Sequence, residues 1–455
     1  MHRVFIVSAF FLPLSFGLPL FAEDVLPSEP NKQLVQEVEQ GEREVANAVW
    51  WGFDEKDSTE FLQKAIRSPA KKIVIPYVGR PWIIRPLKLR GNLELVLEPG
   101  VLLLAKKGEF RGKNASLFTA TSQENITIRG YGATLRMRKK DYQHAPYEKA
   151  EWRMGIMLLG CKNVRLEGLR IESSGGDGIY LGSSEKRHWC EDVVIRNCTC
   201  DDNHRQGISV ISAENLLIEN CVLSNTRGTP PEAGIDFEPD SPHDRIVHCT
   251  VRNCLLENNA GNAILVYLRN LNQSSQAVSL RFENCLGRMG SAAGMTPADF
   301  TGPEMRGESG IAIGAVRDEG PPGLIEFVHC TSENTGRGGL RIYDKSAKGV
   351  QVRFVNCRWS NCWVASYPEH SGPRVPIAFR LNKHSVTTQP GGVEFVHCSI
   401  YGDRDSPTLL YRTDQPGRPL ADVKGTITVH NRFGVRADFG EKPVDVSLQL
   451  IDASK

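Results

Sequence analysis

The sequence predicts an all-β fold, a single-stranded parallel β-helix with an N-terminal capping helix. Two repeating patterns predict it. One is a series of short runs of alternating apolar residues, most of which end in Asn-Cys or His-Cys. The other is a second series of short runs between them, most of which begin with Gly. Two strands in a repeat of 23 residues, the distance from Cys198 to Cys221, indicate coils that stack at the spacing of neighbouring strands.

The two series cover most of the chain after residue 90. The first series comprises residues 163–171, 192–200, 215–223, 278–286, 324–332, 350–358 and 392–400, and segments 92–103 and 125–135 fit its pattern without Cys. The second series comprises residues 155–159, 178–182, 207–211, 234–238, 263–267, 310–314, 339–343 and 376–380.

Residues 1–22 are expected to be a cleaved secretory signal. His2 and Arg3 precede an apolar run that two prolines interrupt, and acidic residues follow the run. The run is short for a membrane-spanning helix, although a retained membrane anchor is the alternative. We therefore expect a secreted or periplasmic protein, with a linker or short helix over residues 23–50.

The solenoid is expected to span residues 51–430, with a C-terminal cap or tail over residues 431–455. A helix within residues 56–76 is expected to cover its open N-terminal end. Asp57 and Glu60 have the spacing of a capping box. The apolar face of this helix comprises Phe61, Leu62, Ala65 and Ile66.

Seven of the twelve cysteines occupy one slot of the repeat. They are Cys198, Cys221, Cys254, Cys285, Cys330, Cys357 and Cys398. Side chains in one slot of stacked coils point the same way, which is poor disulfide geometry. We expect a stack of reduced thiols in the core and, because no CxxC pair occurs, no zinc site. The Asn residues of the slot are expected at turns, bonded to each other's main chains; they are Asn197, Asn220, Asn253, Asn284 and Asn356.

The composition limits the classes of partner. Lys and Arg total 55 against 53 Asp and Glu, which gives a net charge of +2. Bulk charge therefore gives no argument for binding nucleic acid or a membrane surface. No later stretch approaches the roughly 18 apolar residues of a membrane-spanning helix. A soluble monomer is expected after signal cleavage.

The stretch "GIDFEPD" at residues 234–240 places three carboxylates on one face of a strand. The apolar residues that alternate with the acids are expected to point into the core, so Asp236 and Glu238 point outward. Acidic side chains that point outward from a strand without Lys partners repel one another, which lowers the stability of the sheet. We therefore interpret Asp236 and Glu238 as functional and Asp240 as a turn residue.

Stacking the second series in register gives two outward rows. One row contains Met157, Tyr180, Ser209, Asp236, Leu265, Ala312, Arg341 and Ala378. The other contains Leu159, Gly182, Ile211, Glu238, Tyr267, Gly314, Tyr343 and Arg380. The turns that enter this face add Asp177 and the run "DDNHRQ" at residues 201–206.

These residues form a candidate sugar site, in which carboxylates act as acid and base and aromatic rings stack on sugar rings. The catalytic candidates are Asp236, Glu238, Asp202, Asp177 and His204. The substrate-binding candidates are Arg205, Gln206, Tyr180, Tyr267, Arg341, Tyr343 and Trp152. Four of these candidates also have a purely structural interpretation. Asp177 and Asp202 are residues that suit turns, and His204 and Arg205 could form ion pairs with neighbouring carboxylates.

Glycoside hydrolysis needs one protonated and one ionised carboxyl. Same-face neighbours on a strand lie roughly 6.5–7 Å apart, which suits the separation of roughly 6.5–9.5 Å in inverting enzymes. Crowding of Asp236 and Glu238 would also raise the pKa of one of them, as an acid catalyst requires.

The repeat and the cap, "DSTEFLQKAI" (57–66) followed by "IVIP" (73–76), resemble the pectin-lyase-like right-handed β-helix superfamily over residues ~50–430. The resemblance implies a right-handed solenoid and carbohydrate chemistry. Members of this superfamily include glycoside hydrolases, polysaccharide lyases, epimerases, esterases and inert adhesins, so the fold does not fix the reaction.

Two motifs resemble those of polygalacturonases. "GGDG" (175–178) and "DD" (201–202) lie one coil apart, as the corresponding motifs do in that family. The resemblance therefore implies that Asp177, Asp201 and Asp202 correspond to the acids of the family's motifs. The Gly-His-Gly motif of the family is missing, and Arg341-Ile342-Tyr343 matches its Arg-Ile-Lys motif in part. We therefore expect a glycoside hydrolase of another specificity.

Two other functions remain open. A polysaccharide lyase or uronate epimerase would need a base, such as His204 or Arg205, and Ca²⁺ held by Asp236, Glu238 and Asp240; otherwise no cofactor is expected. A non-catalytic glycan-binding surface protein is the third possibility. Clustering of the acids on three adjacent coils argues against it.

An insertion at residues 136–155 interrupts the repeat. It carries six Lys or Arg, three acids and the aromatic residues Tyr142, Tyr147 and Trp152. We interpret it either as a loop that binds an acidic or sulfated glycan or as a solvated insertion of mixed charge.

Overall fold

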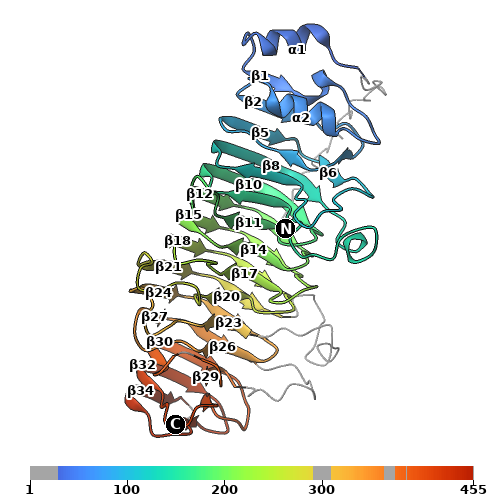
Figure 1. Cartoon of the computed structure of the whole chain (residues 1–455). Helices are drawn as coiled ribbons and strands as arrows, with labels where there is room; N and C mark the ends of the chain where they lie inside the picture. Colours follow the sequence, from blue (N-terminus) through green and yellow to red (C-terminus); the bar gives the residue numbers. More distant parts are fainter. Residues whose placement is uncertain (1–28, 290–308, 363–374, 386, 454–455) are drawn as a thin grey trace, which may run out of the picture.

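The computed structural model of the protein describes residues 29–289, 309–362, 375–385 and 387–453. The expected secretory signal over residues 1–22 lies outside these ranges. The described chain forms a right-handed parallel β-helix whose coils stack along one axis (Figure 1). The predicted fold class is confirmed.

The strands of the described residues form two parallel sheets, of 22 and 12 strands. The larger sheet comprises β1 (Val45–Asn47), β2 (Lys72–Ile75), β3 (Trp82–Ile84), β5 (Leu93–Leu97), β6 (Leu102–Ala105), β8 (Glu124–Arg136), β10 (Lys162–Glu172), β12 (Cys190–Arg196), β13 (Thr199–Asp201), β15 (Ala213–Glu219), β16 (Val222–Ser224), β18 (Ile246–Arg252), β19 (Leu255–Glu257), β21 (Val278–Glu283), β22 (Leu286–Arg288), β24 (Gly323–Val328), β25 (Thr331–Glu333), β27 (Val350–Val355), β28 (Arg358–Ser360), β30 (Gly391–Tyr401), β32 (Ala421–His430) and β34 (Val444–Asp452). The smaller sheet comprises β4 (Leu87–Lys88), β7 (Phe118–Thr121), β9 (Ile156–Leu159), β11 (Ile179–Gly182), β14 (Gln206–Val210), β17 (Ala233–Phe237), β20 (Ile264–Tyr267), β23 (Ser309–Gly314), β26 (Gly338–Tyr343), β29 (Ile377–Leu381), β31 (Leu409–Thr413) and β33 (Ala437–Asp438).

A regular coil has three strand faces rather than the two expected. In the coil that starts with β12, the chain turns at Asn197, continues as β13 and then crosses to β14 in the smaller sheet. Strand β13 is three residues long. A strand of this length is too short to be recognised from alternating residues, so the expectation of two series missed it.

The corner between the first two faces is formed by a left-handed residue of the repeated slot. Its φ lies between 49° and 54° at Asn197, Asn220, Asn253, Asn284, His329, Asn356 and His397. Asn and His adopt this conformation more readily than most residues do. The expected turn position is confirmed, but the main-chain N–H groups of these Asn residues donate to carbonyls of other residues in the next coil, as from Asn197 to Glu219 at 3.1 Å. One side-chain bond joins two of them, from Asn284 Nδ2 to Asn253 Oδ1 at 3.3 Å.

Glycines that begin the second series let neighbouring coils approach closely. A Cβ on Gly178 would lie 2.7 Å from the carbonyl oxygen of Gly207, and one on Gly207 would lie 2.4 Å from that of Gly234. A larger residue at these positions would push the coils apart.

All twelve cysteines are free and buried. The seven thiols of the repeated slot each donate a hydrogen bond to the carbonyl two residues earlier, at 3.3–3.6 Å. The thiols therefore act as small core side chains with a satisfied donor.

We expect iodoacetamide to label all twelve thiols when the protein is denatured without reductant. The native protein should react slowly, because the thiols are buried and thiolate formation in an apolar core is unfavourable. Intact mass spectrometry measures both states. A denatured mass that indicates several disulfides would contradict the register of this slot.

Four buried phenylalanines stack on successive coils of the core. The ring centroids of Phe282 and Phe327 lie 4.7 Å apart, those of Phe327 and Phe354 4.9 Å apart, and those of Phe354 and Phe395 5.3 Å apart. The planes of each pair differ by 15° or less. The stack follows from one apolar slot repeated at the strand spacing.

The N-terminal end is covered by α1 (Lys32–Glu39), the short 3-10 helix η1 (Ala48–Trp51) and α2 (Thr59–Arg67), as Figure 1 shows. The expected apolar face of α2 is buried at Leu62, Ala65 and Ile66. The capping box was wrong in detail. Ser58 is the N-cap, Asp57 accepts from the N–H of Thr59, and Glu60 pairs instead with Arg85.

The C-terminal end is built differently. Residues 431–455 were expected to be a cap or tail, but they contribute β34, which pairs in parallel with β32 as a further strand of the larger sheet. The side chains of Val446, Leu448 and Leu450 continue the core slots and are only partly buried.

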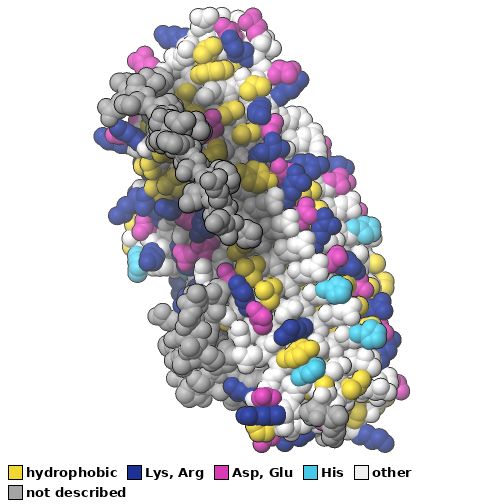
Figure 2. Space-filling model, turned by 180° about the vertical axis from the view of Figure 1, so that it is seen from behind, with side chains coloured by type: hydrophobic (Ala, Val, Ile, Leu, Met, Phe, Trp, Pro, Cys, Tyr) yellow, Lys and Arg dark blue, Asp and Glu magenta, His cyan; other side chains and the backbone are white. Residues whose placement is uncertain are grey.

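Charged side chains of both signs are interspersed over the face seen in Figure 2. Many pair across coils, as Arg252 does with Glu219 and Arg129 with Glu167. Within the described residues, no helix is long and apolar enough to span a membrane.

Candidate functional site

The smaller sheet brings the candidate residues of the second series into register. Tyr180 on β11, Ser209 on β14 and Asp236 on β17 are paired neighbours. The first predicted row is confirmed over its whole length, from Met157 to Ala378.

Asp236 lies on the outward side of the strand, but it is buried. Its side chain is 1% exposed, whereas an exposed row of acids was expected. The side chain of Gln206, also buried, lies beside it and donates from Nε2 to Asp236 Oδ2 at 2.9 Å. Gln206 Oε1 accepts from the N–H of Ala233 at 2.8 Å, so Gln206 orients Asp236 from the neighbouring coil. Both ends of the Gln206 amide are thus used within the protein, and its role as a substrate ligand stays a prediction.

Glu238 follows β17 directly and pairs with a cation. Its Oε2 accepts a hydrogen bond from Nη2 of Arg205 at 3.3 Å, and its charge is among the causes that raise the pKa of Asp236. The separation of ~6.5–7 Å between the Asp236 and Glu238 carboxyls, estimated from strand geometry, stays a prediction.

Asp177 completes the group that we call the carboxylate cluster: Asp177, Asp236 and Glu238. Asp177 lies in the turn before β11 and is 0% exposed. Among the described residues, neither of its carboxyl oxygens has a hydrogen-bond partner of good geometry, and the same holds for Oδ1 of Asp236. Buried polar atoms are rarely left unpaired without a functional reason.

The cluster favours protonated acids. Burial, followed by the charge of Glu238, raises the pKa of Asp236 well above its ordinary value, against the charge of Arg205. Burial also raises the pKa of Asp177 to about 7, again opposed by Arg205. Two carboxyls with raised pKa values beside a third that is paired with Arg205 form a set of groups suited to acid–base chemistry.

We expect the stability of the protein to fall as pH rises from about 4 to about 7 through the titration of Asp177. Between its ordinary pKa of 3.8 and its folded pKa of about 7, the folded state holds a proton that the unfolded state releases. The free energy of unfolding, measured by urea denaturation at several pH values, should fall by up to a few kcal/mol.

The Asp177→Asn variant should lack this part of the pH dependence, since Asn does not titrate. The other charges that act on Asp177 come from Arg205, Glu151 and Glu238, which the variant keeps. Equal slopes for variant and wild type between pH 4 and 7 would contradict the raised pKa.

Asp202 and His204 belong to a second polar group, beside the insertion. Asp202 Oδ1 accepts from Lys139 Nζ at 2.7 Å, and its Oδ2 accepts from Ser173 Oγ at 2.8 Å. His204 Nε2 lies 2.9 Å from Thr229 Oγ1. Burial, followed by the charge of Lys139, lowers the pKa of His204 to about 4. Both candidates are thus used in structural contacts, and His204 is neutral at pH 7.

The neighbouring acid of the "DD" motif, Asp201, is also structural. It forms an ion pair with Arg170 and accepts hydrogen bonds from Ser224 Oγ and Asn225 Nδ2 at 2.8 Å and 2.7 Å. The carry-over from polygalacturonases therefore places Asp177, but neither acid of the "DD" motif, in the carboxylate cluster.

An aromatic wall adjoins the cluster. The rings of Tyr267 and Tyr343 are stacked, with centroids 6.3 Å apart, and the guanidinium of Arg341 lies 5.0 Å from the centre of the Tyr343 ring. Burial raises the pKa of Tyr343, opposed by the charge of Arg341. The Tyr343 ring packs against Ala233, Leu265 and Ala312, and Leu265 pairs with Asp236 in the row.

The other two aromatic candidates lie differently. Tyr180 lies two rungs before Asp236 in the row, whereas Tyr267 and Tyr343 follow on later rungs. Burial raises the pKa of Tyr180, and the charges of Asp240 and Asp177 add to this effect. Trp152 is 43% exposed. It remains a candidate for stacking on a sugar at the edge of the site.

Three polar neighbours of the cluster were not among the predicted site residues. Glu151, from the insertion, lies 3.8 Å from Nε of Arg205. Ser209 lies between Tyr180 and Asp236, and Asp240 was assigned to a turn. Burial, followed by the charges of Asp244 and Glu238, raises the pKa of Asp240. The outward row already contained Ser209, whereas no repeat signal marks Glu151.

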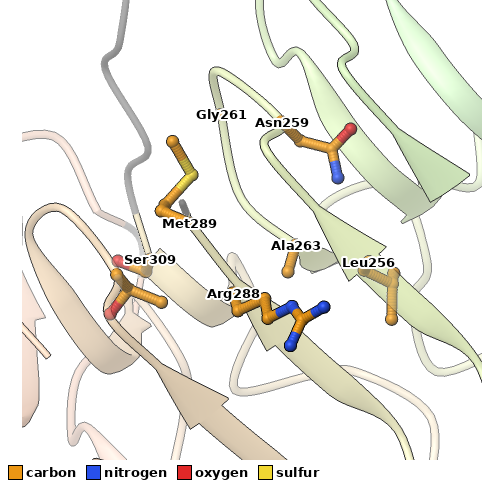
Figure 3. Close-up of a pocket in the computed structure, with 8 residues that line it drawn as sticks. Leu256, Asn259, Gly261, Ala263, Arg288, Met289 and Ser309 are labelled. Atoms are coloured by element: carbon orange, nitrogen blue, oxygen red, sulfur yellow. The ribbon is translucent and has the colours of Figure 1, made fainter. Parts of the chain in front are cut away.

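A small cavity elsewhere in the fold is not part of this site. It has a volume of about 10 Å³ and is lined by Leu256, Asn259, Gly261, Ala263, Arg288, Met289, Ser309 and Thr335 (Figure 3). This cavity has room for about one water, and no acid lines it, so it is excluded as a sugar site. Across the residues that the structure describes, no group of three or more His, Cys, Asp or Glu is arranged to hold a metal ion.

Sequence comparisons agree with the fold. The family described as "Right handed beta helix region" matches residues 147–286. Two Bacillus subtilis proteins are similar. The uncharacterized protein YclG is 27% identical over 187 residues, which cover 38% of this chain and 32% of YclG. The SPbeta prophage-derived uncharacterized protein YorA is 23% identical over 290 residues, or 60% of this chain and 46% of YorA. The chain thus spans about a third to a half of the length of these relatives.

Solved structures share the fold at low sequence identity. The family 28 exopolygalacturonase of Yersinia enterocolitica aligns over 90% of this chain and 78% of its own, with a TM-score of 0.54 and 13% identity. The A-module of the Azotobacter vinelandii mannuronan C-5 epimerase AlgE4 aligns over 90% and 100%, with a TM-score of 0.56 and 13% identity. The Streptococcus pneumoniae surface adhesin PfbA aligns over 90% and 93%, with a TM-score of 0.55 and 12% identity. The pectin-lyase-like β-helix fold is therefore shared with carbohydrate-active enzymes and with an adhesin.

Proposed function

We propose that the protein is an exported glycoside hydrolase that acts as a monomer and cleaves its glycan at the carboxylate cluster. The burial of Asp236 two residues before Glu238, which pairs with Arg205, carries this proposal. Hydrolysis of a glycosidic bond needs one carboxyl that holds a proton and one that is ionised. Burial of Asp236 and the pairing of Glu238 with Arg205 supply this asymmetry.

The roles follow from these positions. Asp236 donates its proton to the glycosidic oxygen as the bond to the sugar breaks, and Gln206 holds its carboxyl in place. Glu238 takes up the proton of the attacking water, and Arg205 balances its charge before this step. Asp177, with a pKa of about 7 raised by burial, keeps the site close to neutral.

The aromatic wall supports a sugar as the ligand. Stacked Tyr267 and Tyr343 present ring faces beside the cluster, and aromatic faces suit the apolar faces of sugar rings. Tyr180 and Trp152 extend this lining on the other sides.

The alternatives are weaker on specific grounds. A lyase needs a free base near the sugar, whereas His204 is bound to Thr229 and Arg205 is paired with two carboxylates. A binding protein such as an adhesin has no evident use for buried carboxyls that lack hydrogen-bond partners.

A polysaccharide panel tests the proposal. Wild-type protein should release reducing ends from at least one glycan, without a rise in the ultraviolet absorbance of unsaturated products and without inhibition by EDTA. Asp236→Asn serves as the inactive control. Unsaturated products would indicate a lyase, and binding without any product would indicate a non-catalytic protein.

A further inference from the structure

Arg205 lies between two glutamates that come from different segments of the chain. Its Nη2 is 3.3 Å from Oε2 of Glu238, which follows β17, and its Nε is 3.8 Å from Oε1 of Glu151, in the insertion. Charge-assisted hydrogen bonds between a guanidinium and a carboxylate are usually about 2.7–2.9 Å long. Both separations exceed this length, so the two glutamates share the guanidinium and neither pairs with it closely.

Gly176 fixes the positions of Arg205 and Glu151 relative to each other. Its carbonyl oxygen accepts hydrogen bonds from the N–H groups of His204 and Arg205, each at 3.0 Å. A Cβ on Gly176 would lie 2.7 Å from the carbonyl oxygen of Glu151 and 2.9 Å from the main-chain nitrogen of Arg153. Because glycine has no Cβ, the insertion and the turn before β14 can both contact this residue.

The end of the insertion that carries Glu151 is firmly attached to the solenoid. Arg153 is 0% exposed and donates hydrogen bonds to four main-chain carbonyls. Arg153 and Gly175 also form an isolated antiparallel β-bridge. Buried main-chain contacts therefore set the place of Glu151 beside Arg205, although the Glu151 side chain is 28% exposed.

The basic residues of the insertion are used in different ways. Lys139 pairs with Asp202 at 2.7 Å and so makes a second contact with the solenoid. Lys140 and Lys149 are exposed, and for these two side chains the binding of an acidic or sulfated glycan stays a prediction. Glu151 has the opposite charge and is connected to the carboxylate cluster through Arg205.

On the basis of the proposed function, we propose that Glu151 is a positioning residue for the reaction. It draws the guanidinium of Arg205 away from Glu238, so that Glu238 keeps its ability to take up the proton of the attacking water. A carboxylate that is closely paired with a guanidinium is a weaker base, because the pairing stabilises its charged form. The insertion is in this way a part of the catalytic site.

Replacing Glu151 with Gln tests this role. Gln keeps the size of the side chain and removes its charge, so Arg205 should close on Glu238. We expect kcat to fall about tenfold, a usual size for the coupling of contacting charged residues, and KM to change by less than about twofold. Loss of a substrate ligand would instead raise KM. Initial rates on the glycan that wild-type protein cleaves in the polysaccharide panel measure both constants.

Glu148→Gln is the matched control. It removes the same charge from an exposed side chain of the same insertion and keeps the main-chain carbonyl that accepts from Arg153 at 2.6 Å. This variant should retain the kcat and KM of the wild type. Circular dichroism of both variants checks that the fold is kept.

A double-mutant cycle separates the proposed role from a general loss of structure. If Glu151 acts through Glu238, adding Glu151→Gln to the Glu238→Gln variant should lower the residual rate by less than about twofold, because the base is already absent. A further tenfold loss in this background would overturn the proposal.

Two other results would also overturn it, namely an unchanged kcat in Glu151→Gln or a raised KM with kcat unchanged. Either result with an active wild-type protein would contradict the role of Glu151 alone. A wild-type protein that cleaves no glycan would contradict the proposed hydrolase as well, so failures of the two proposals can be told apart.

Discussion

Replacing Asp236 with Asn is expected to lower turnover about 100-fold or more, the scale of lost general acid catalysis. The variant keeps the size of the side chain and the position of Gln206 beside it, but it has no proton to donate. Because burial disfavours the charged form of Asp236 and raises its pKa, a neutral amide should fit its place without loss of fold. Initial rates on the substrate found in the polysaccharide panel measure the effect.

The matched control is Asp192→Asn, which changes an acid at a left-handed turn outside the cluster. It should retain wild-type turnover, since Asn suits this backbone conformation. Glu238→Gln should lose activity on a scale similar to Asp236→Asn. Near-wild-type rates for both cluster variants, with native circular dichroism, would place the chemistry elsewhere on the solenoid.

Replacing Phe327 with Ala is expected to lower the free energy of unfolding by about 3–5 kcal/mol, the usual result of removing a buried ring. Phe327 is 0% exposed and stacks between Phe282 and Phe354. Its loss leaves a cavity that two stacked coils cannot close, because strand pairing fixes their separation. Urea denaturation followed by circular dichroism measures the change.

Phe433→Ala is the control for this prediction. Phe433 is 47% exposed, so its replacement should change stability by no more than about 0.5 kcal/mol. Similar losses for the two variants would show that the phenylalanine stack contributes no more to stability than a surface ring does.

The predictable part of the fold was the part that repeats. The slots of Cys, Asn and the outward row recur in coil after coil, so the register from Met157 to Ala378 could be read before any coordinates were known. The third strand face was not predicted, because β13, one of its strands, is only three residues long.

The candidate site was harder to predict, because side-chain direction along a strand does not fix burial. Asp236 points outward as expected but is covered by side chains of neighbouring coils. Asp202 and Glu238 are both acids that directly follow a strand, in successive coils. Lys139 from the insertion pairs with Asp202, whereas Arg205 pairs with Glu238. Such pairings depend on an irregular loop that carries no repeat.

The two ends of the solenoid differ in how well their apolar side chains are covered, so local unfolding should begin at the C-terminal end. At the N-terminal end, α2 buries its apolar face against the first coils. At the other end, β34 pairs with a described strand on one side, and its core-facing side chains stay half in water. Peeling β34 away would place β32 at the same kind of edge, so opening can advance one coil at a time. The carboxylate cluster lies in the middle coils, so several C-terminal coils must open before this opening reaches it.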